Sequence, residues 1–441
     1  MQFAEKTLAQ HLQAMIRCRT VSHERGTETD WQEFAKLHEL LENYYPVIYR
    51  EFNLTETGEA GLQFSYQADQ PKKKPLLLMA HQDVVETGNE AKWTYAPFAG
   101  EIQDGMLWGR GATDCKHLLL AELEAVEKLF AAGWRPDYDL YLSFGFGEEI
   151  YRADGPDGAE LLCAVLQEKG VRLGCIIDEG GYIQKHQKTR VARIGLGEKA
   201  CVNFEIYKTC AGGHSSKPGK GTALGSVAKA AAAVEEHPYP YRLTPLVKAQ
   251  LQASAVIEIG DRKRVFAEPE NYWQELCEYA RQDKELDAML HTTIAVTMAS
   301  ASNQPNVLPS YASMTLSCRI LQGDTVDSVM TYLKQFLPEG VEIRHISGKD
   351  PVKTAVPDSN EFKTIAGVLR QQYGENLVVV PFLMLGATDT RYYAPIVDNV
   401  FLFDGFVRDE RWGEAHQIDE RIPVDTLAGA CDFFVKFLTS Y

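Results

Sequence analysis

The feature that most restricts the fold of this chain is a series of short apolar runs that alternate with helical patterns and end in acidic or histidine residues. Residues 75–85 (PLLLMAHQDVV), 138–149 (YDLYLSFGFGEE) and 173–181 (LGCIIDEGG) are typical of buried strands. Helical patterns follow Asp114 and cover residues 158–170, so each strand-helix step takes roughly thirty residues. This alternation predicts an α/β domain with a largely parallel sheet and helices on both faces.

The pattern changes near residue 198. Two strand-helix-strand units follow and predict a ferredoxin-like α+β domain, with strands at 199–209, 291–300, 311–321 and 340–347 and helices at 222–236 and 325–337. Residues 237–290 read as an elaboration of that domain. We place it at residues 198–350, inserted into a catalytic domain made of residues 1–197 and 351–441. His81 and His416 are both candidate metal ligands and must lie close together, which supports an insertion between the two parts of one domain.

Composition excludes several classes of function. The chain carries 45 Lys+Arg against 61 Asp+Glu, a net charge of -16, which disfavours binding to nucleic acid or to an anionic membrane. The nine cysteines form no CxxC pair, and their scattered use fits a reducing cytosol. The N-terminal segment has apolar residues at helical spacing and lacks the short apolar stretch of a signal peptide. After it, residues 47–55 and 61–68 alternate like strands. We therefore expect a cytoplasmic protein with no membrane span.

Three candidate site residues lie at the end of the first buried strand and at the start of the helix that follows it. His81 and Asp83 lie on one face of a strand, so the Asp83 carboxylate can orient His81. Asp114 can bridge two metal ions, although an Asp at this position is equally suited to cap a helix. An HxD pair alone is better explained as a solvated strand end.

Four further candidates follow later apolar runs. Glu148 and Glu149 are neighbours, so one can bind metal while the other faces a water molecule. Asp178 ends a strand and His416 lies in a polar loop, where each has an ordinary structural explanation. Taken together, these residues supply mixed nitrogen and oxygen ligands for two close metal ions and one spare carboxylate to act as a base.

Eight motifs spread over nearly the whole chain resemble one known family. They are HQDVV, WTYAPFAGEIQDGMLWGRGATDCK, GEE, IIDEGG, GGHSSKP, QPNVLP, GATDTR and HQIDERI. In this order they resemble the di-zinc metallopeptidases that include aminoacylase, glutamate carboxypeptidase, succinyl-diaminopimelate desuccinylase and carboxypeptidase S, with the carboxypeptidase S branch most similar. The resemblance implies two divalent ions, zinc by expectation with Co²⁺ or Mn²⁺ as alternatives. It also implies an inserted lid domain that forms a homodimer.

The resemblance assigns a role to each metal-site residue. Asp114 would bridge the ions, His81 and Asp178 would complete one site, and Glu149 and His416 the other. Glu148 would be the general base, and Asp83 would belong to the catalytic group beside His81. Two positions depart from the family pattern. Cys115 stands where an Asp or a small residue is commoner, after a peptide bond that is often cis in relatives, and Gln417 replaces a frequent Gly.

Three residues are candidates for contact with substrate. Arg391 can clamp a free carboxylate with its guanidinium fork, or it can simply pair with Asp389. His214 lies in a glycine- and serine-rich loop that is either a turn or a platform for an imidazole, and relatives use this histidine from the partner subunit to stabilise the tetrahedral intermediate. Asn306 is similar to a lid residue that approaches the site.

These observations predict a di-zinc amidohydrolase that cleaves small peptides or N-acyl amino acids with a free carboxylate, as carboxypeptidases and dipeptidases do. An aminoacylase is the alternative among enzymes. A metal-dependent binding protein without turnover is the alternative of another class. The presence of Glu148 argues against that last alternative, because binding alone needs no unliganded acid there.

Overall fold

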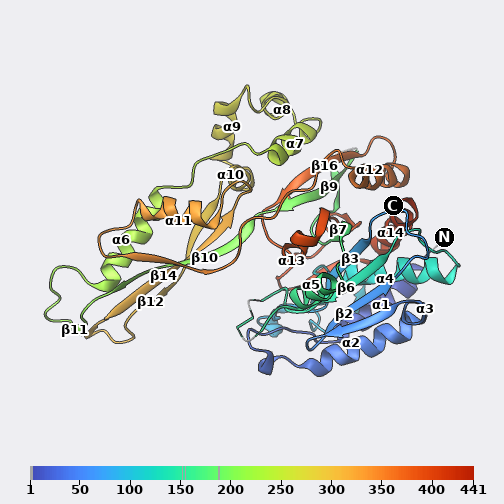
Figure 1. Ribbon diagram of the computed structural model, residues 1–441, viewed down its shortest axis with the longest axis horizontal. Helices are drawn as coiled ribbons and strands as arrows, with labels where there is room; N and C mark the ends of the chain where they lie inside the picture. Colours follow the sequence, from blue (N-terminus) through green and yellow to red (C-terminus); the bar gives the residue numbers. More distant parts are fainter. Residues whose placement is uncertain (1–2, 151, 154, 187–188) are drawn as a thin grey trace. The chain divides into compact units, whose positions relative to one another are not determined.

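The computed structural model describes residues 3–150, 152–153, 155–186 and 189–441 (Figure 1). The chain divides into two compact units. The first unit comprises Met1–Leu196, Ala355–Phe382 and Thr388–Tyr441, and the second comprises Gly197–Thr354 and Leu383–Ala387. Among the described residues, no helix has both the length and the hydropathy needed to cross a lipid bilayer.

A ten-stranded sheet runs through the first unit in the order β1-β2-β6-β3-β7-β17-β9-β8-β18, with β16 paired to β9. Its strands are β1 (Asn53–Thr57), β2 (Gly61–Tyr66), β3 (Leu76–His81), β6 (Leu140–Gly145), β7 (Leu173–Asp178), β8 (Ile183–His186), β9 (Thr189–Glu198), β16 (Val378–Met384), β17 (Val397–Leu402) and β18 (Val407–Arg408). The central strands β6, β3, β7 and β17 are parallel, and antiparallel pairs flank them. Every residue of β3, β6 and β7 is buried, which is why these strands are continuous apolar runs in the sequence.

Helices cover this sheet. α4 (Lys116–Ala131) packs on β3 and contacts α1 (Glu5–Arg17) and α14 (Leu427–Ser440), and α14 also contacts α12 (Asn360–Tyr373). Another group is formed by α5 (Gly158–Glu168), which packs on β2 and β6, and by the short α13 (Thr390–Tyr393). α2 (Trp31–Tyr44) contacts both α1 and α3 (Pro46–Glu51). The predicted α/β fold class, with a largely parallel central sheet, is confirmed.

One local prediction is wrong. Residues 47–55 were expected to form a strand, but the chain is helical in α3 and only β1 is extended. Pro46 occupies the first turn of α3, where its missing N–H costs nothing. The Glu127 carboxylate accepts the backbone N–H groups of Val47 and Ile48 at 2.9–3.1 Å. A tertiary contact therefore caps a helix whose residues alternate like a strand.

The second unit contains a four-stranded antiparallel sheet in the order β12-β14-β10-β15. Along the chain its elements are β10 (Ala200–Thr209), α6 (Ala223–Glu236), β12 (Thr293–Ser300), β14 (Tyr311–Ile320), α11 (Val326–Lys334) and β15 (Glu342–Ser347). This chain order and strand order are those of the predicted ferredoxin-like domain. Thr325 and Ser328 form a capping box that starts α11.

Smaller elements complete the two units. Four helices lie between α6 and β12, namely α7 (Pro245–Ser254), α8 (Gly260–Ala267), α9 (Trp273–Ala280) and α10 (Lys284–Leu290). β11 (Gly213–His214) pairs with β13 (Val307–Leu308) in the second unit. In the first unit, β4 (Glu101–Gln103), β5 (Met106–Trp108) and β19 (Arg421–Pro423) form a three-stranded sheet.

Candidate metal centre

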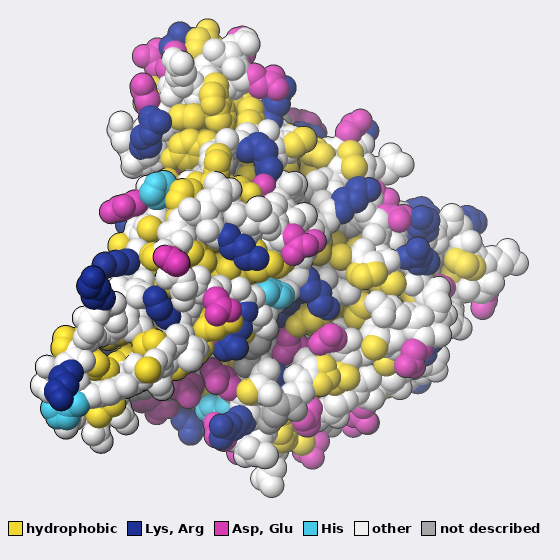
Figure 2. Space-filling model, turned by 60° about the vertical axis from the view of Figure 1, so that its left-hand side comes forward, with side chains coloured by type: hydrophobic (Ala, Val, Ile, Leu, Met, Phe, Trp, Pro, Cys, Tyr) yellow, Lys and Arg dark blue, Asp and Glu magenta, His cyan; other side chains and the backbone are white. Residues whose placement is uncertain are grey.

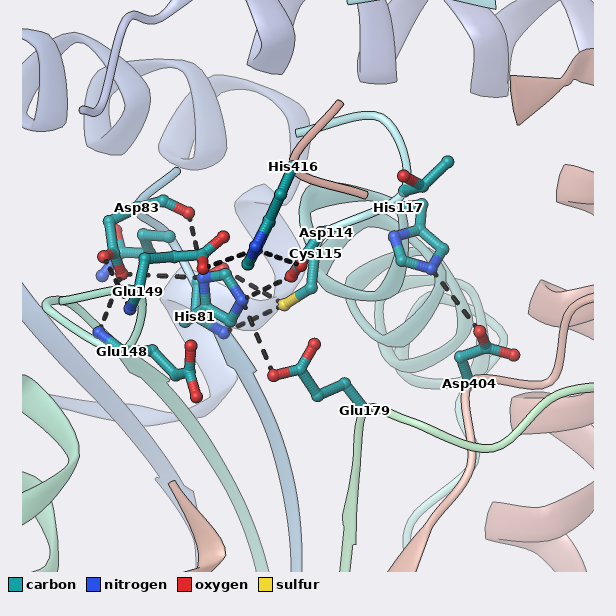
Figure 3. A network of polar contacts seen from close by, with 12 residues as sticks. His81, Asp83, Asp114, Cys115, His117, Glu148, Glu149, Glu179, Asp404 and His416 are labelled. Atoms are coloured by element: carbon teal, nitrogen blue, oxygen red, sulfur yellow. Dashed lines mark hydrogen bonds and ion pairs between the residues drawn. The ribbon is translucent and has the colours of Figure 1, made fainter. Parts of the chain in front are cut away.

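The candidate site lies at the carboxyl ends of the central parallel strands. His81 is the last residue of β3, Glu148 and Glu149 follow β6, and Glu179 follows β7. Parallel strands end at one edge of a sheet, so these side chains converge there (Figure 3). Asp114 joins them from the turn that precedes α4.

Asp114 stands between the two histidines. Its Oδ1 atom lies 3.0 Å from Nε2 of His81, and its Oδ2 atom lies 3.1 Å from Nε2 of His416. His416 Nε2 is also 2.8 Å from Oε2 of Glu149, and His81 Nε2 is 3.7 Å from Oε1 of Glu179. Two groups of potential ligands therefore share one carboxylate, with one oxygen directed to each group.

The contacts of His81 fix which ring nitrogen can bind a metal. Nδ1 of His81 lies 2.9 Å from the backbone carbonyl oxygen of Asp83 and 3.6 Å from the Asp83 carboxylate. A carbonyl oxygen only accepts, so Nδ1 donates its proton and the lone pair of the neutral ring belongs to Nε2. The sequence suggests that the Asp83 carboxylate orients His81, whereas the shorter contact is with the Asp83 backbone carbonyl.

The Asp83 carboxylate has a different role. Its two oxygens lie 3.4 Å from the backbone nitrogens of Glu148 and Glu149, at the limit of a hydrogen bond. Asp83 is fully buried. Its carboxylate therefore faces the backbone of the turn that presents both glutamates.

The structure brings Glu179 toward His81, although sequence reasoning chose the preceding acid, Asp178. Among the described residues, two groups have potential ligand atoms that all lie within 4.8 Å of one another. One group is His81, Asp114, Cys115 and Glu179, and the other is Asp114, Glu149 and His416. Neither group contains Asp178. Asp178 is still within β7, whereas Glu179 lies just beyond the end of this strand. The sequence offers two adjacent acids at a strand end and does not indicate which of them faces the site.

Burial and crowding shift the protonation of the acids. Burial raises the pKa of Glu149 to about 7, although the hydrogen bond from His416 acts in the opposite direction. Burial and the nearby carboxylate of Glu179 raise the pKa of Glu148 well above its usual value. The carboxylates of Asp114 and Glu149 raise the pKa of His416 to about 10. The site therefore has more negative charge than its own histidines neutralise.

These residues fit divalent metal ions. Ligand atoms about 2.1 Å from a tetrahedral ion lie about 3.4 Å from one another. The observed separations of 2.8–3.7 Å between histidine nitrogens and carboxylate oxygens are close to this value. Oε1 of Glu149 is buried and accepts no hydrogen bond from the described residues, so it has room for a further partner. The Asp114–Cys115 peptide bond is cis, and the Cys115 sulfur accepts the His81 N–H at 3.2 Å.

Arg391 lies near this centre in the same unit. It donates through Nη1 to the Thr388 carbonyl at 2.7 Å and through Nη2 to the Tyr392 hydroxyl at 3.3 Å. Asp157 and Asp389 each lie 3.5 Å from Nη2, so the structural pairing considered for Arg391 exists. Its side chain nevertheless keeps 32% of its surface exposed, which leaves part of the fork accessible.

The sequence indicates Asp389 only as a possible ion-pair partner of Arg391. It is buried, and burial raises its pKa to about 7 against the effect of Arg391. A second acid, Asp157, faces Arg391 from the start of α5. The sequence gives no signal for Asp157, because it is far from Arg391 along the chain.

His214 and Asn306 lie together in the second unit. His214 pairs with Val307 across β11 and β13, and the Asn306 carbonyl accepts the Ser215 N–H at 3.1 Å. The Ser216 N–H lies 3.2 Å from Nδ1 of His214, so Nδ1 accepts and the neutral ring carries its proton on Nε2. The exposed imidazole is thus a hydrogen-bond donor through Nε2. Figure 2 shows that histidine side chains reach this face of the molecule at several separate places.

A carboxylate shared between two histidine groups, beside a further acid and at the carboxyl edge of a parallel sheet, is an arrangement suited to metal-dependent hydrolysis. Residues 77–440 match the model of peptidase family M20/M25/M40, and the chain belongs to this family. It is therefore a hydrolytic enzyme that acts on peptide or other amide bonds.

Individual relatives agree with this assignment. The chain is 29% identical to "Carboxypeptidase S" of Saccharomyces cerevisiae over 93% of this chain and 79% of the relative. It is 28% identical to "N-fatty-acyl-amino acid synthase/hydrolase PM20D1" of Mus musculus over 99% of this chain and 89% of the relative. Among solved structures, an M20 family metallo-carboxypeptidase, Sso-CP2 from Sulfolobus solfataricus, has the same fold with a TM-score of 0.72 at 20% identity, covering 99% of this chain and 98% of that one.

Proposed function

We propose that this protein is a two-metal hydrolase that cleaves an amide bond in small peptides or N-acyl amino acids with a free carboxylate. The observation that carries the proposal is the geometry of Asp114, which directs one oxygen toward His81 and the other toward His416. The similarity to carboxypeptidase S and to an N-fatty-acyl-amino acid synthase/hydrolase supports this range of substrates.

The proposed ligands form two sets. His81, Asp114 and Glu179 would hold one ion, and Asp114, Glu149 and His416 the other. Imidazole and carboxylate donors suit zinc, with Co²⁺ or Mn²⁺ as alternatives. Bound ions of this kind polarise a carbonyl group and lower the pKa of water to about 7. This assignment replaces Asp178 with Glu179, because Glu179 is the acid next to His81.

Glu148 is the proposed general base. It belongs to neither ligand set, it is half-buried, and its pKa is well above that of an ordinary carboxyl group. A carboxylate with a raised pKa can accept a proton from water and later donate it to the leaving nitrogen. Asp83, whose carboxylate faces the backbone nitrogens of Glu148 and Glu149, would position both side chains.

Arg391 and His214 would bind the two polar ends of the reacting group. Arg391 is proposed to read the substrate carboxylate through the accessible part of its fork. His214 carries a donor at Nε2, which suits an oxyanion; each such donor contributes about 3–4 kcal/mol in studied hydrolases. We further propose that the second unit forms the homodimer interface, and that His214, with Asn306 beside it, acts on the site of the partner subunit.

A deacylase is the second candidate, because the alignment with the N-fatty-acyl-amino acid synthase/hydrolase covers almost the whole chain. Substrate preference distinguishes a peptidase from a deacylase. A free dipeptide presents an ammonium group on the acyl side of the scissile bond, whereas an N-acyl amino acid presents an alkyl chain.

The test is turnover on matched panels. Purified protein with added Zn²⁺ is assayed on dipeptides and on N-acyl amino acids that share one C-terminal residue. We expect hydrolysis of at least one panel, a loss of about 10²–10⁴-fold in Glu148→Gln, and full activity in the control Glu168→Gln, which changes an exposed acid on α5. No turnover on either panel by metal-loaded protein would contradict the proposal and favour a binding role.

A further inference from the structure

One buried carboxylate outside both ligand sets joins the two chain segments that carry Asp114 and His416. Oε1 of Glu420 accepts the Thr113 backbone N–H at 2.7 Å and the Thr113 hydroxyl at 3.0 Å. Oε2 of Glu420 accepts Nη1 of Arg110 at 2.6 Å. Glu420 and Arg110 are 0% and 2% exposed. Both carboxylate oxygens are occupied, so Glu420 does not serve as a metal ligand.

The positions of these contacts along the chain give them their significance. Thr113 immediately precedes Asp114, and Glu420 comes four residues after His416 in the same loop. Backbone contacts run in parallel, because Gly109 N–H donates to the Glu420 carbonyl at 2.9 Å, and β5 pairs with β19 directly after Glu420. The Glu420 side chain, together with these backbone contacts, holds the segment of one proposed ligand against the segment of another.

The loop that carries His416 needs such support. His416 and Asp419 have φ values of 61° and 65°, in the left-handed region that side chains other than glycine rarely adopt. Asp419 is tied to Thr94, whose backbone N–H and hydroxyl donate at 2.7 and 2.8 Å, but this contact is exposed. Glu420 provides the buried contact of the loop.

Arg110 fixes the other side of the carboxylate. Its guanidinium lies 5.3 Å from the Trp93 ring centroid and donates to the Glu86 carbonyl at 3.2 Å. A planar fork held at three points cannot follow a carboxylate that moves. The position of Glu420, and with it the spacing between Asp114 and His416, is therefore set by a rigid partner.

We propose that Glu420 is a positioning residue that fixes the spacing between Asp114 and His416 and so determines the affinity of the second metal ion. The proposal rests on the two-ion function argued above. The ion held by Asp114, Glu149 and His416 depends on this spacing. The ion at His81 depends on it less, because His81 ends strand β3 and its ring is oriented by Asp83.

The experiment is a calorimetric titration of metal-free protein with Zn²⁺, which resolves the first and second equivalents. In Glu420→Gln an amide replaces the carboxylate at nearly the same volume, and its NH₂ group faces Arg110. We expect the second equivalent to bind about 10–100-fold more weakly, as for other groups that orient ligands, while the first changes by less than about threefold. Asp425→Asn, which removes an exposed acid paired with Arg411, should leave both equivalents unchanged.

The outcomes separate positioning from general stability. Thermal unfolding of the metal-free variant is measured in parallel, and equal weakening of both equivalents would assign Glu420 to general stability and overturn the proposal. An unchanged second equivalent would overturn it as well. If Glu420→Gln fails to fold, Arg110→Lys, which keeps the charge and loses the fork, is judged by the same criterion. A wild-type protein that binds fewer than two ions would overturn the two-ion function itself, and this proposal with it.

Discussion

Two of the proposed metal ligands carry protons near neutral pH when no metal is bound, His416 almost completely and Glu149 in part. The carboxylates of Asp114 and Glu149 raise the pKa of His416 to about 10, and burial raises that of Glu149 to about 7. A metal ion needs both groups unprotonated, so binding at this set must release protons. The proton on His416 stabilises the metal-free fold at low pH and is lost as pH rises through about 10. Metal affinity therefore changes with the opposite sign and increases as pH rises.

The size of the effect follows from these values. A pH of about 8 is two units below the His416 pKa of about 10, and this difference alone would weaken metal binding about 100-fold, or by about 2.7 kcal/mol. Its side chain is 55% exposed, so solvent screening reduces this penalty, and we expect about tenfold. Below about pH 7 the dependence should steepen from one proton toward two, because Glu149 is then protonated as well.

Calorimetry in buffers of different ionisation enthalpy counts the protons released with the second equivalent of Zn²⁺. We expect about one proton at pH 8 and about one and a half at pH 7. His416→Ala, which keeps the ligand set of His81, gives the count for the first equivalent alone. A second equivalent that releases no protons at pH 8, with an affinity that is flat between pH 7 and 8, would refute the reasoning.

Three further outcomes are expected. Glu179→Gln should weaken the first equivalent of Zn²⁺ by more than tenfold while Asp178→Asn leaves it nearly unchanged, and the reverse order in a titration would restore Asp178 as the ligand. Arg391→Lys should lower kcat/KM about 10–100-fold, and amidation of the substrate carboxylate should abolish cleavage; equal rates on free and amidated substrates would exclude the clamp. Co-refolded His214→Ala and Glu148→Gln chains, each inactive alone, should regain activity if His214 acts across a dimer, whereas inactivity despite proven subunit exchange would place His214 in cis.

The fold was predictable where local pattern and burial agree. Strands β3, β6 and β7 are buried along their whole length, so the sequence shows them as apolar runs. The prediction failed for α3, whose residues alternate like a strand. The helix is favoured there by Pro46 in its first turn and by Glu127, which accepts two N–H groups from 79–80 residues away. Such a contact has no local signature in the sequence.

The same distinction between local pattern and distant contacts applies to the residues of the candidate site. His81 ends the buried strand β3, and Glu148 and Glu149 lie shortly after β6, so their positions along the chain alone bring them to one edge of the sheet. The choice between Asp178 and Glu179 depends on the residue at which β7 ends, which is finer than sequence patterns resolve. Glu420 and Thr113 both lie within motifs that carry the family resemblance, but the sequence does not show that they are in contact, because 307 residues separate them.

The charge of the site also explains why metal loading matters for the proposed base. The carboxyl groups of Asp114, Glu149 and Glu179 lie close to His81 and His416 (Figure 3), and the protein as a whole carries 61 acidic residues against 45 basic ones. Without metal, burial and the nearby carboxylate of Glu179 raise the pKa of Glu148 well above its usual value, which favours the protonated form that cannot act as a base. Added positive charge at the two ligand sets lowers the pKa of a carboxyl group beside them, because it favours the ionised form. Metal loading should therefore increase the fraction of Glu148 that is ionised, and loss of activity on metal removal should include weakening of the base as well as loss of the ions.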